Sequence, residues 1–303
     1  MKIVLIVIII ILAFALALFV LWESVGFCVT SYDIVTEKKL DRDYKLVFLS
    51  DLHDTDTDCC FDRNKVDEYS RGEHKGHNKR LLNAIDVIDP DFVLLGGDMI
   101  TSYMQPSYNS DITFEFIKEL SLKHKVYFGI GNHEQRYLED EMFDGKYDEL
   151  KKFVTGLNIP FLENRGEFPE GSNIGIYGLL IPMLYYRRVV PKHLPEGFVR
   201  DSLGQADDSR FNILLAHTPD HFDDYADWNP DLVLSGHVHG GIIGVPGIGG
   251  LISPQLRLFP KYDAGLFENG KSRMLLSRGI GWHTIPLRIF NRAEVIVINI
   301  KNK

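Results

Sequence analysis

The 303-residue sequence has few cysteines and a deficit of positive charge. Its three cysteines, two of them adjacent at Cys59 and Cys60, form neither a disulfide framework nor a Cys-x-x-Cys site. Lysine and arginine number 33 against 42 aspartates and glutamates, a net charge of -9. Because binding to nucleic-acid phosphates needs clustered Lys and Arg, this balance argues against a nucleic-acid partner. The chain also lacks internal repeats, and no low-complexity linker divides residues 45–303.

Charged and polar side chains are absent from residues 3–22. At about 1.5 Å per residue, a helix of this length matches the hydrocarbon core of a bilayer. A cleaved signal peptide is the alternative, but the apolar run continues past the small alanines that would offer a cleavage point. We therefore expect a transmembrane signal-anchor helix over 3–22, a connector over 23–44 and one domain over 45–303. Lys2 precedes the helix, which favours a single-pass protein of the cell membrane with an extracytoplasmic domain.

Five short apolar runs each end at Asp, Asn or His. In the clearest, residues 92–96 are apolar or glycine, and Gly97 and Asp98 follow them. Such runs are typical of strands buried on both faces, and α/β sheets bind ligands at the carboxyl ends of their strands. We therefore expect the functional site where the five runs end. The five stretches are 46–53, 91–98, 126–133, 212–217 and 232–239.

Other segments have weaker patterns. Apolar spacing predicts helices over 78–89, 112–122 and 147–157. The shorter runs are expected to form a second sheet, and they cover 173–178, 274–277 and 295–300. An edge strand is possible near Ile34 and Val35. The polar stretch 54–77 is expected to be a surface excursion. Its cysteines and histidines also suggest a third metal site, although their spacing fits no standard zinc motif.

The polar groups at the strand ends suit metal binding. Imidazole and carboxylate together favour Mn, Zn or Fe, whereas Ca and Mg prefer oxygen ligands alone. Seven such donors exceed the needs of one ion, but they fit two ions that share a carboxylate. A lone buried His is more often structural than a ligand, but that explanation would have to hold at five strand ends together. The candidates are Asp51, His53, Asp98, Asn132, His133, His217, His237 and His239.

The order of these motifs resembles that of the calcineurin-like metallophosphoesterases. The resemblance rests on Asp51-x-His53, Gly97-Asp98, Gly131-Asn-His-Glu134, His217 and Gly236-His-Val-His239. Four further stretches resemble the membrane-associated bacterial phosphodiesterase branch: 237–241, 259–265, 277–281 and 287–291. The resemblance implies an α/β fold, a four-layer α-β-β-α sandwich of two mixed β-sheets flanked by helices.

The resemblance also implies roles for the site residues. Two ligand sets share one residue: Asp51, His53 and His239 for one divalent ion, Asn132, His217 and His237 for the other, and Asp98 bridging both. His133 would bind no metal, but would stabilise charge on the substrate phosphoryl group or protonate the leaving oxygen. The nucleophile would be a hydroxide that bridges the two ions.

Two departures bear on the substrate. Protein phosphatases of this superfamily carry an Arg after the bridging Asp, and here residues 99–102 contain none. The segment 240–252 is apolar and rich in glycine, so it is either a packed loop or a lipid-contacting rim. We expect a phosphodiesterase or pyrophosphatase that acts on a lipid or another envelope phosphodiester. A phosphodiesterase for soluble nucleotides and a non-catalytic binding module on the same fold are the alternatives.

Overall fold

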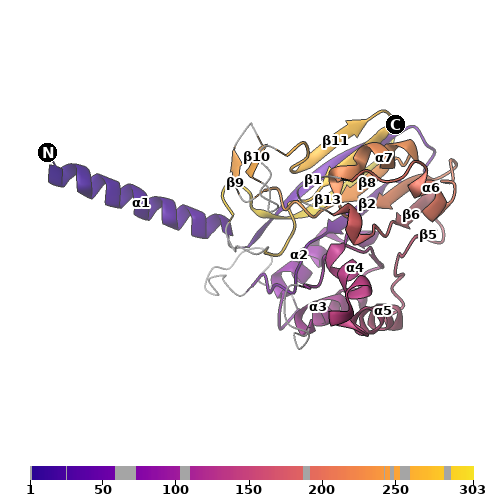
Figure 1. The fold of residues 1–303 in the computed structure, drawn as a ribbon, viewed down its shortest axis with the longest axis horizontal. Helices are drawn as coiled ribbons and strands as arrows, with labels where there is room; N and C mark the ends of the chain where they lie inside the picture. Colours follow the sequence, from indigo (N-terminus) through magenta and orange to yellow (C-terminus); the bar gives the residue numbers. More distant parts are fainter. Residues whose placement is uncertain are drawn as a thin grey trace.

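The computed structural model describes nine segments of the chain: 2–24, 26–58, 73–102, 110–186, 192–241, 243–245, 249–252, 260–282 and 288–303. Two β-sheets form the centre of the body, and helices cover them (Figure 1).

The first sheet has five strands in the order β1-β13-β2-β3-β4. They are β1 (Phe27–Thr36), β13 (Ala293–Asn302), β2 (Tyr44–Leu49), β3 (Phe92–Leu95) and β4 (Val126–Phe128). Strand β13 runs parallel to β1 and antiparallel to β2, whereas β2, β3 and β4 are mutually parallel. The carboxyl ends of β2, β3 and β4 therefore lie at one edge of this sheet.

The second sheet has six strands in the order β11-β12-β8-β7-β6-β5. They are β11 (Gly265–Asn269), β12 (Ser272–Leu276), β8 (Leu232–Ser235), β7 (Phe211–Leu215), β6 (Ile174–Gly178) and β5 (Arg165–Glu167). The four inner strands are parallel, and β11 and β5 are antiparallel to their neighbours. A separate hairpin pairs β9 (Ile243–Val245) with β10 (Gly249–Ile252).

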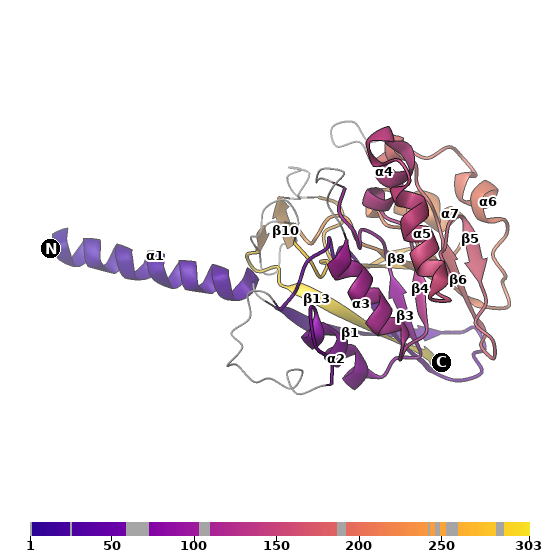
Figure 2. The ribbon, with the colours of Figure 1, turned by 90° about the horizontal axis from the view of Figure 1, so that it is seen from below.

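Apart from α1, helices cover the outer faces of both sheets (Figure 2). The helices are α1 (Lys2–Ser24), α2 (Lys79–Ile88), α3 (Asp111–Ser121), α4 (Asn132–Glu139), α5 (Lys146–Gly156), α6 (Phe198–Leu203) and α7 (Phe222–Asp227). Short 3₁₀ turns are η1 (Glu141–Phe143), η2 (Met183–Tyr185) and η3 (Pro219–His221). The predicted helices 78–89, 112–122 and 147–157 correspond to α2, α3 and α5. Helices α3 and α5 each bury one face, whereas α2 buries all of its residues from Arg80 to Ile85.

Among the described residues, three apolar clusters fill the space between the layers. Phe48 of β2 and Ile213 of β7 belong to one cluster, which fills the space between the two sheets. The opposite face of the first sheet packs against α2, α3 and α5, for example through Ile117. The outer face of the second sheet packs against α6 and α7, for example through Tyr225. The predicted fold of two mixed sheets flanked by helices is therefore confirmed.

Two strands differ from the sequence prediction. The run 295–300 was expected in the second sheet, but as part of β13 it lies inside the first sheet, between β1 and β2. The connector 23–44 was expected to hold an edge strand near Ile34 and Val35, whereas β1 spans ten residues. Its polar side chains hid the strand, because residues such as Thr30 and Asp33 pair across the sheet edge with Glu294 and Lys301 of β13.

Helix α1 projects from the body (Figures 1 and 2). Its apolar side chains are exposed, for example 62% for Val4 and 51% for Leu18. Within the part of the chain whose residues are described, no helix is both long enough and apolar enough to cross a bilayer. The predicted transmembrane helix over 3–22 is therefore not confirmed.

Candidate metal centre

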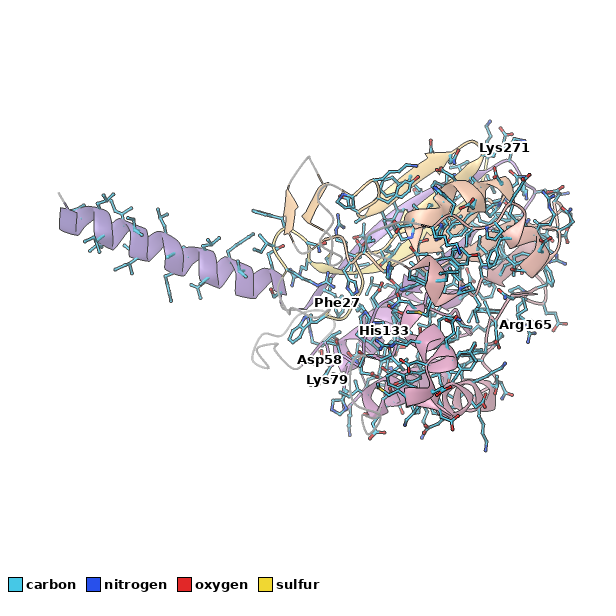
Figure 3. All side chains as sticks on the ribbon, in the orientation of Figure 1. Phe27, Asp58, Lys79, His133, Arg165 and Lys271 are labelled. Atoms are coloured by element: carbon cyan, nitrogen blue, oxygen red, sulfur yellow. The ribbon has the colours of Figure 1, made fainter. Side chains whose placement is uncertain are left out.

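The ends of five strands bring the predicted site residues together. Asp51 and His53 follow β2, Asp98 follows β3, and His217 and the 237–239 turn follow β7 and β8. Asn132 and His133 begin α4 after β4. Figure 3 labels His133, which lies near the middle of the body. Because the parallel strands of both sheets end on the same side, residues up to 188 positions apart in the sequence (51 and 239) can share one site.

The first cluster contains Asp51, His53 and His239, whose ligand atoms lie within 4.8 Å of one another. The Nε2 atoms of His53 and His239 are 3.1 Å apart. Asp51 Oδ1 lies 3.3 Å from the His239 nitrogen and 3.8 Å from that of His53. All three side chains are buried. Three donor atoms that converge on one point, away from solvent, fit a divalent ion.

The second cluster contains Asp98, His217 and His237, again with ligand atoms within 4.8 Å of one another. His217 Nε2 lies 3.1 Å from Asp98 Oδ2, and that same oxygen lies 3.9 Å from His53 Nε2 of the first cluster. Asp98 therefore stands between the two clusters. Among the described residues, the buried Oδ1 of Asn132 accepts no hydrogen bond. A buried amide oxygen that accepts no hydrogen bond can serve as a further ligand for a metal ion.

A third possible grouping contains His53, Asp98 and His133. His133 Nε2 lies 3.9 Å from Asp98 Oδ2, and the rings of His53 and His133 meet edge to face at 4.7 Å. On the other side of its ring, His133 Nδ1 faces the backbone N–H and the hydroxyl of Ser102. Burial lowers the pKa of His133 and so favours its neutral form.

The buried charges are mutually dependent. Burial opposes a charge on His217, but the carboxylates of Asp98 and Asp51 raise the pKa of His217 to about 10. Its Nδ1–H donates to the Gly96 carbonyl over 2.8 Å, so Nε2 is the nitrogen that faces both acids. Burial and the neighbouring Asp98 charge raise the pKa of Asp51 to about 6. Without an ion, a proton on His217 thus compensates part of the negative charge.

Unusual backbone conformations recur among the candidate ligands. Five candidate ligands have φ between 49° and 72°, in the left-handed region: Asp51, His53, Asp98, His237 and His239. Such residues cost roughly 1–3 kcal/mol each and cluster at functional sites. Gly97, at φ 90°, lets two of the loops meet, because a Cβ there would lie 2.2 Å from the Gly131 nitrogen.

Glu134 holds the loop that carries Asp98. Its carboxylate accepts hydrogen bonds from the backbone N–H groups of Asp98 (2.8 Å), Met99 (2.9 Å), Ile100 (3.3 Å) and Gly131 (2.9 Å). Burial and the Asp98 charge raise the pKa of Glu134 to about 7. The sequence prediction included Glu134 only as part of a motif. Its place at the third residue of a helix is the signal that would have suggested a capping role.

Arg288 and Asn291 hold the ligand loops from the far end of the chain. The buried Arg288 guanidinium donates to the carbonyls of Arg278, Gly279, Gly281 and Asn291. Asn291 in turn donates to the carbonyl of His239 over 2.6 Å. Gly281 N–H donates to the Asp51 carbonyl over 2.8 Å, so the clamped loop supports the first cluster directly. Neither residue had a predicted role.

The polar stretch 54–77 was expected to lie on the surface, but its first residue is buried. Asp54 is buried and accepts hydrogen bonds from Thr101, Ser110 and Thr113. Near its other end, His74 lies 3.1 Å from Asp86 of α2. Cys59 and Cys60 lie outside the described residues, as do the side chains of Ile242, Ile243 and Val245 in the segment 240–252.

The profile of the calcineurin-like phosphoesterases matches residues 44–241. This chain belongs to that family. An uncharacterised metallophosphoesterase of Campylobacter jejuni, Cj0846, is 25% identical over 297 residues, which are 95% of this chain and 68% of that protein. The uncharacterised metallophosphoesterase YkuE of Bacillus subtilis is 35% identical over 101 residues, 33% of this chain and 35% of that protein.

A zebrafish protein named as a transmembrane protein with a metallophosphoesterase domain is 27% identical over 269 residues, 85% of this chain and 53% of that protein. The chain thus spans from about a third to about two thirds of the length of these relatives. The family is one of metal-dependent phosphoesterases with two metal ions, and the Asp and His clusters of this chain could bind metal.

Proposed function

We propose that this chain is a two-metal phosphodiesterase or pyrophosphatase. The observation that carries this proposal is the position of Asp98, whose Oδ2 lies 3.1 Å from His217 of one cluster and 3.9 Å from His53 of the other. A carboxylate between two such clusters can bind two ions at once, as a two-metal phosphoesterase requires.

The proposed ligands are the seven residues predicted for the metals. Asp51, His53 and His239 would hold one ion, Asn132, His217 and His237 the other, and Asp98 would bridge them. The mixture of nitrogen and oxygen donors favours Mn, Zn or Fe. When bound, two such ions would supply the Lewis acidity that activates water and neutralises phosphoryl charge.

The protein side chains would position the substrate and exclude water from the site. Asp51, Asp98 and His217 are each at most 2% exposed, so their electrostatic interactions are strong. His133 would contact the phosphoryl group, because its Nε2 lies 3.9 Å from the shared carboxylate.

The residues after Asp98 favour a diester over a monoester. Met99 and Ile100 occupy the first two positions, and both are fully buried in the apolar core. No guanidinium from this loop segment is therefore available to bind the dianionic end of a phosphomonoester. This supports a diester or pyrophosphate substrate and counts against a phosphoprotein.

We also infer that the substrate is a lipid or another amphipathic phosphoester presented at a membrane. The exposed apolar surface of α1 supports attachment to a membrane. The base of α1 is joined to the body near the site: the Ser24 hydroxyl accepts from the Arg288 N–H over 3.0 Å, and the Ser24 carbonyl accepts from Trp282. Phe19 contacts Phe290, with ring centroids 4.9 Å apart. The name of the zebrafish relative agrees with this inference, and an extracytoplasmic orientation remains a prediction.

The decisive experiment measures metal content and turnover together. The full chain is placed in vesicles and supplied separately with Zn, Mn or Fe(II). It is then assayed on a vesicle-borne lipid phosphodiester, on a soluble nucleotide phosphodiester and on a phosphomonoester. We expect two ions per chain and preferred turnover of the lipid diester. Preference for the soluble nucleotide would replace the lipid inference, and two bound ions without any turnover would favour a binding module.

A further inference from the structure

Ser102 approaches the side of the His133 ring that faces away from Asp98. The Ser102 backbone nitrogen lies 2.6 Å from His133 Nδ1, and the Ser102 hydroxyl oxygen lies 2.9 Å from the same atom. A backbone N–H can only donate, so Nδ1 must be the acceptor. A neutral imidazole carries one N–H, which must then be on Nε2. The contact with Ser102 therefore selects one tautomer of His133.

Thr101, the residue before Ser102, is held through both of its backbone polar groups. The Thr101 N–H donates to Asp54 Oδ2 over 2.8 Å, and the Thr101 carbonyl accepts from the Tyr137 hydroxyl over 3.1 Å. Tyr137 and His133 both belong to α4, four residues apart and hence on one helix face. These two contacts help to fix the position of the Ser102 N–H. The residues involved are all buried: Asp54, Thr101, Ser102, His133 and Tyr137.

We propose that Ser102 is a positioning residue that holds His133 as the tautomer with its proton on Nε2, so that His133 donates a hydrogen bond to the phosphoryl group. This inference rests on the proposed phosphoesterase function. It adds a residue to which neither the motifs nor the family assignment gives a role.

The tautomer decides between metal binding and hydrogen bonding. An Nε2 that carries a proton has no lone pair for an ion, so the grouping of His53, Asp98 and His133 does not form a third metal site. That leaves the two clusters that contain Asp51 and His217.

The tautomer also separates the two roles that the sequence left open for His133. A neutral imidazole that lost its only N–H proton would become an imidazolate, which is a poor product of acid catalysis at neutral pH. Hydrogen-bond donation from Nε2 stabilises developing negative charge and transfers no proton. A carboxylate or carbonyl in the place of the Ser102 N–H would select the opposite tautomer.

Nitrogen-15 NMR of histidine in the zinc-loaded full chain tests the tautomer directly. The His133 signals are identified by their loss in His133→Gln. We expect a proton on Nε2 and none on Nδ1, in wild type and in Ser102→Ala, which keeps the backbone N–H. A proton on Nδ1 would overturn the proposal. This measurement needs no turnover. A wrong tautomer can therefore be distinguished from a wrong proposed function, which would appear as an inactive wild-type protein.

Kinetics test the consequence. Ser102→Pro removes the N–H, and we expect a loss of about 10- to 100-fold in turnover with both metals retained, since such supporting contacts have effects of this size. His133→Gln, which can donate a hydrogen bond but transfer no proton, should exceed His133→Ala in turnover. The Gln variant should lose the same factor on diesters with good and with poor leaving groups.

Three kinetic results would contradict the proposal. The first is a folded, metal-loaded Ser102→Pro variant with wild-type turnover. The second is a His133→Gln variant no better than His133→Ala. The third is a loss confined to poor leaving groups, which would indicate proton transfer. If Ser102→Pro does not fold, the NMR of the wild type and the turnover of the two His133 variants still test the proposal.

Discussion

The Nε2 atoms of His53 and His239 lie 3.1 Å apart, although 186 positions separate the residues in the chain. Their rings are stacked, with centroids 5.0 Å apart and planes 17° from parallel. Asp51 Oδ1 lies 3.3 Å from the His239 nitrogen. A direct hydrogen bond between the rings would use only two of these three atoms, whereas a divalent ion would use all of them. This geometry makes metal binding the property to test first.

Metal binding should release protons. The carboxylates of Asp98 and Asp51 overcome the effect of burial and raise the pKa of His217 to about 10, so the metal-free ring carries a proton at pH 7.5. That proton must leave before Nε2 can bind an ion. Affinity should therefore fall as the pH falls from about 10, by about tenfold per pH unit for each proton released. Calorimetry in two buffers of different ionisation enthalpy measures the number of protons released when metal binds. Release of no proton at pH 7.5 would contradict a protonated His217 in the metal-free chain.

Asp98→Asn should abolish turnover and lower the metal content below two ions per chain. A neutral amide cannot bridge two cations as a carboxylate does, and the charge that balances His217 is lost as well. Elemental analysis and a diester assay measure both effects. The matched control is Asp208→Asn, at an exposed position, which should behave as wild type. Retention of two ions by Asp98→Asn would exclude Asp98 as the bridge.

Arg288→Ala should destabilise the fold and weaken metal binding together. The substitution removes a donor from four carbonyl groups. That of Gly279 keeps the Glu294 N–H, and each buried carbonyl left unsatisfied costs about 1–3 kcal/mol. The freed loop includes Gly281, which contacts Asp51. Urea unfolding with and without zinc measures both changes.

The control for Arg288 is Arg42→Ala. Arg42 forms a surface ion pair with Asp91 at 2.7 Å, and such pairs contribute at most about 1 kcal/mol. Equal urea midpoints for the two variants would show that the hydrogen bonds of the Arg288 guanidinium are not important for stability.

Asp54→Asn should change how the stability of the metal-free chain depends on pH. Burial raises the pKa of Asp54 to about 6 from its usual 3.8. Because the folded-state pKa is raised, this group favours the fold fully below about pH 4, and the contribution is lost as the pH rises through 6. Asn does not titrate, so the variant should lose less stability than wild type between pH 4 and pH 7.

The readout for Asp54 is the slope of unfolding free energy against pH in the presence of a chelator, and not its absolute value. The control Asp208→Asn should keep the wild-type slope. An unchanged slope in Asp54→Asn would mean that the pKa of Asp54 is the same in the folded and the unfolded chain.

Local patterns explain which parts of the fold could be predicted. Helices α3 and α5 each bury one face, so apolar residues recur at helical spacing, and the apolar residues of α2 follow the same spacing although its residues 80–85 are all buried. Strands such as β3 and β8 are buried on both faces and read as unbroken apolar runs. Strand β1 was underestimated because its burial alternates irregularly and its polar residues pair across the sheet edge.

The residues that could carry the chemistry were predictable from local patterns in the sequence. Polar groups that end buried strands have a strong local signature, and Asp51, Asp98 and His217 all have it. The pairing of strands separated by hundreds of residues could be seen in the folded chain alone, where β13 lies in the first sheet between β1 and β2. The partners of His133 and of Arg288 could likewise be seen only there. Those partners include backbone groups. Every residue has a carbonyl and every residue except proline has an N–H, so no side-chain pattern marks which of them will be used.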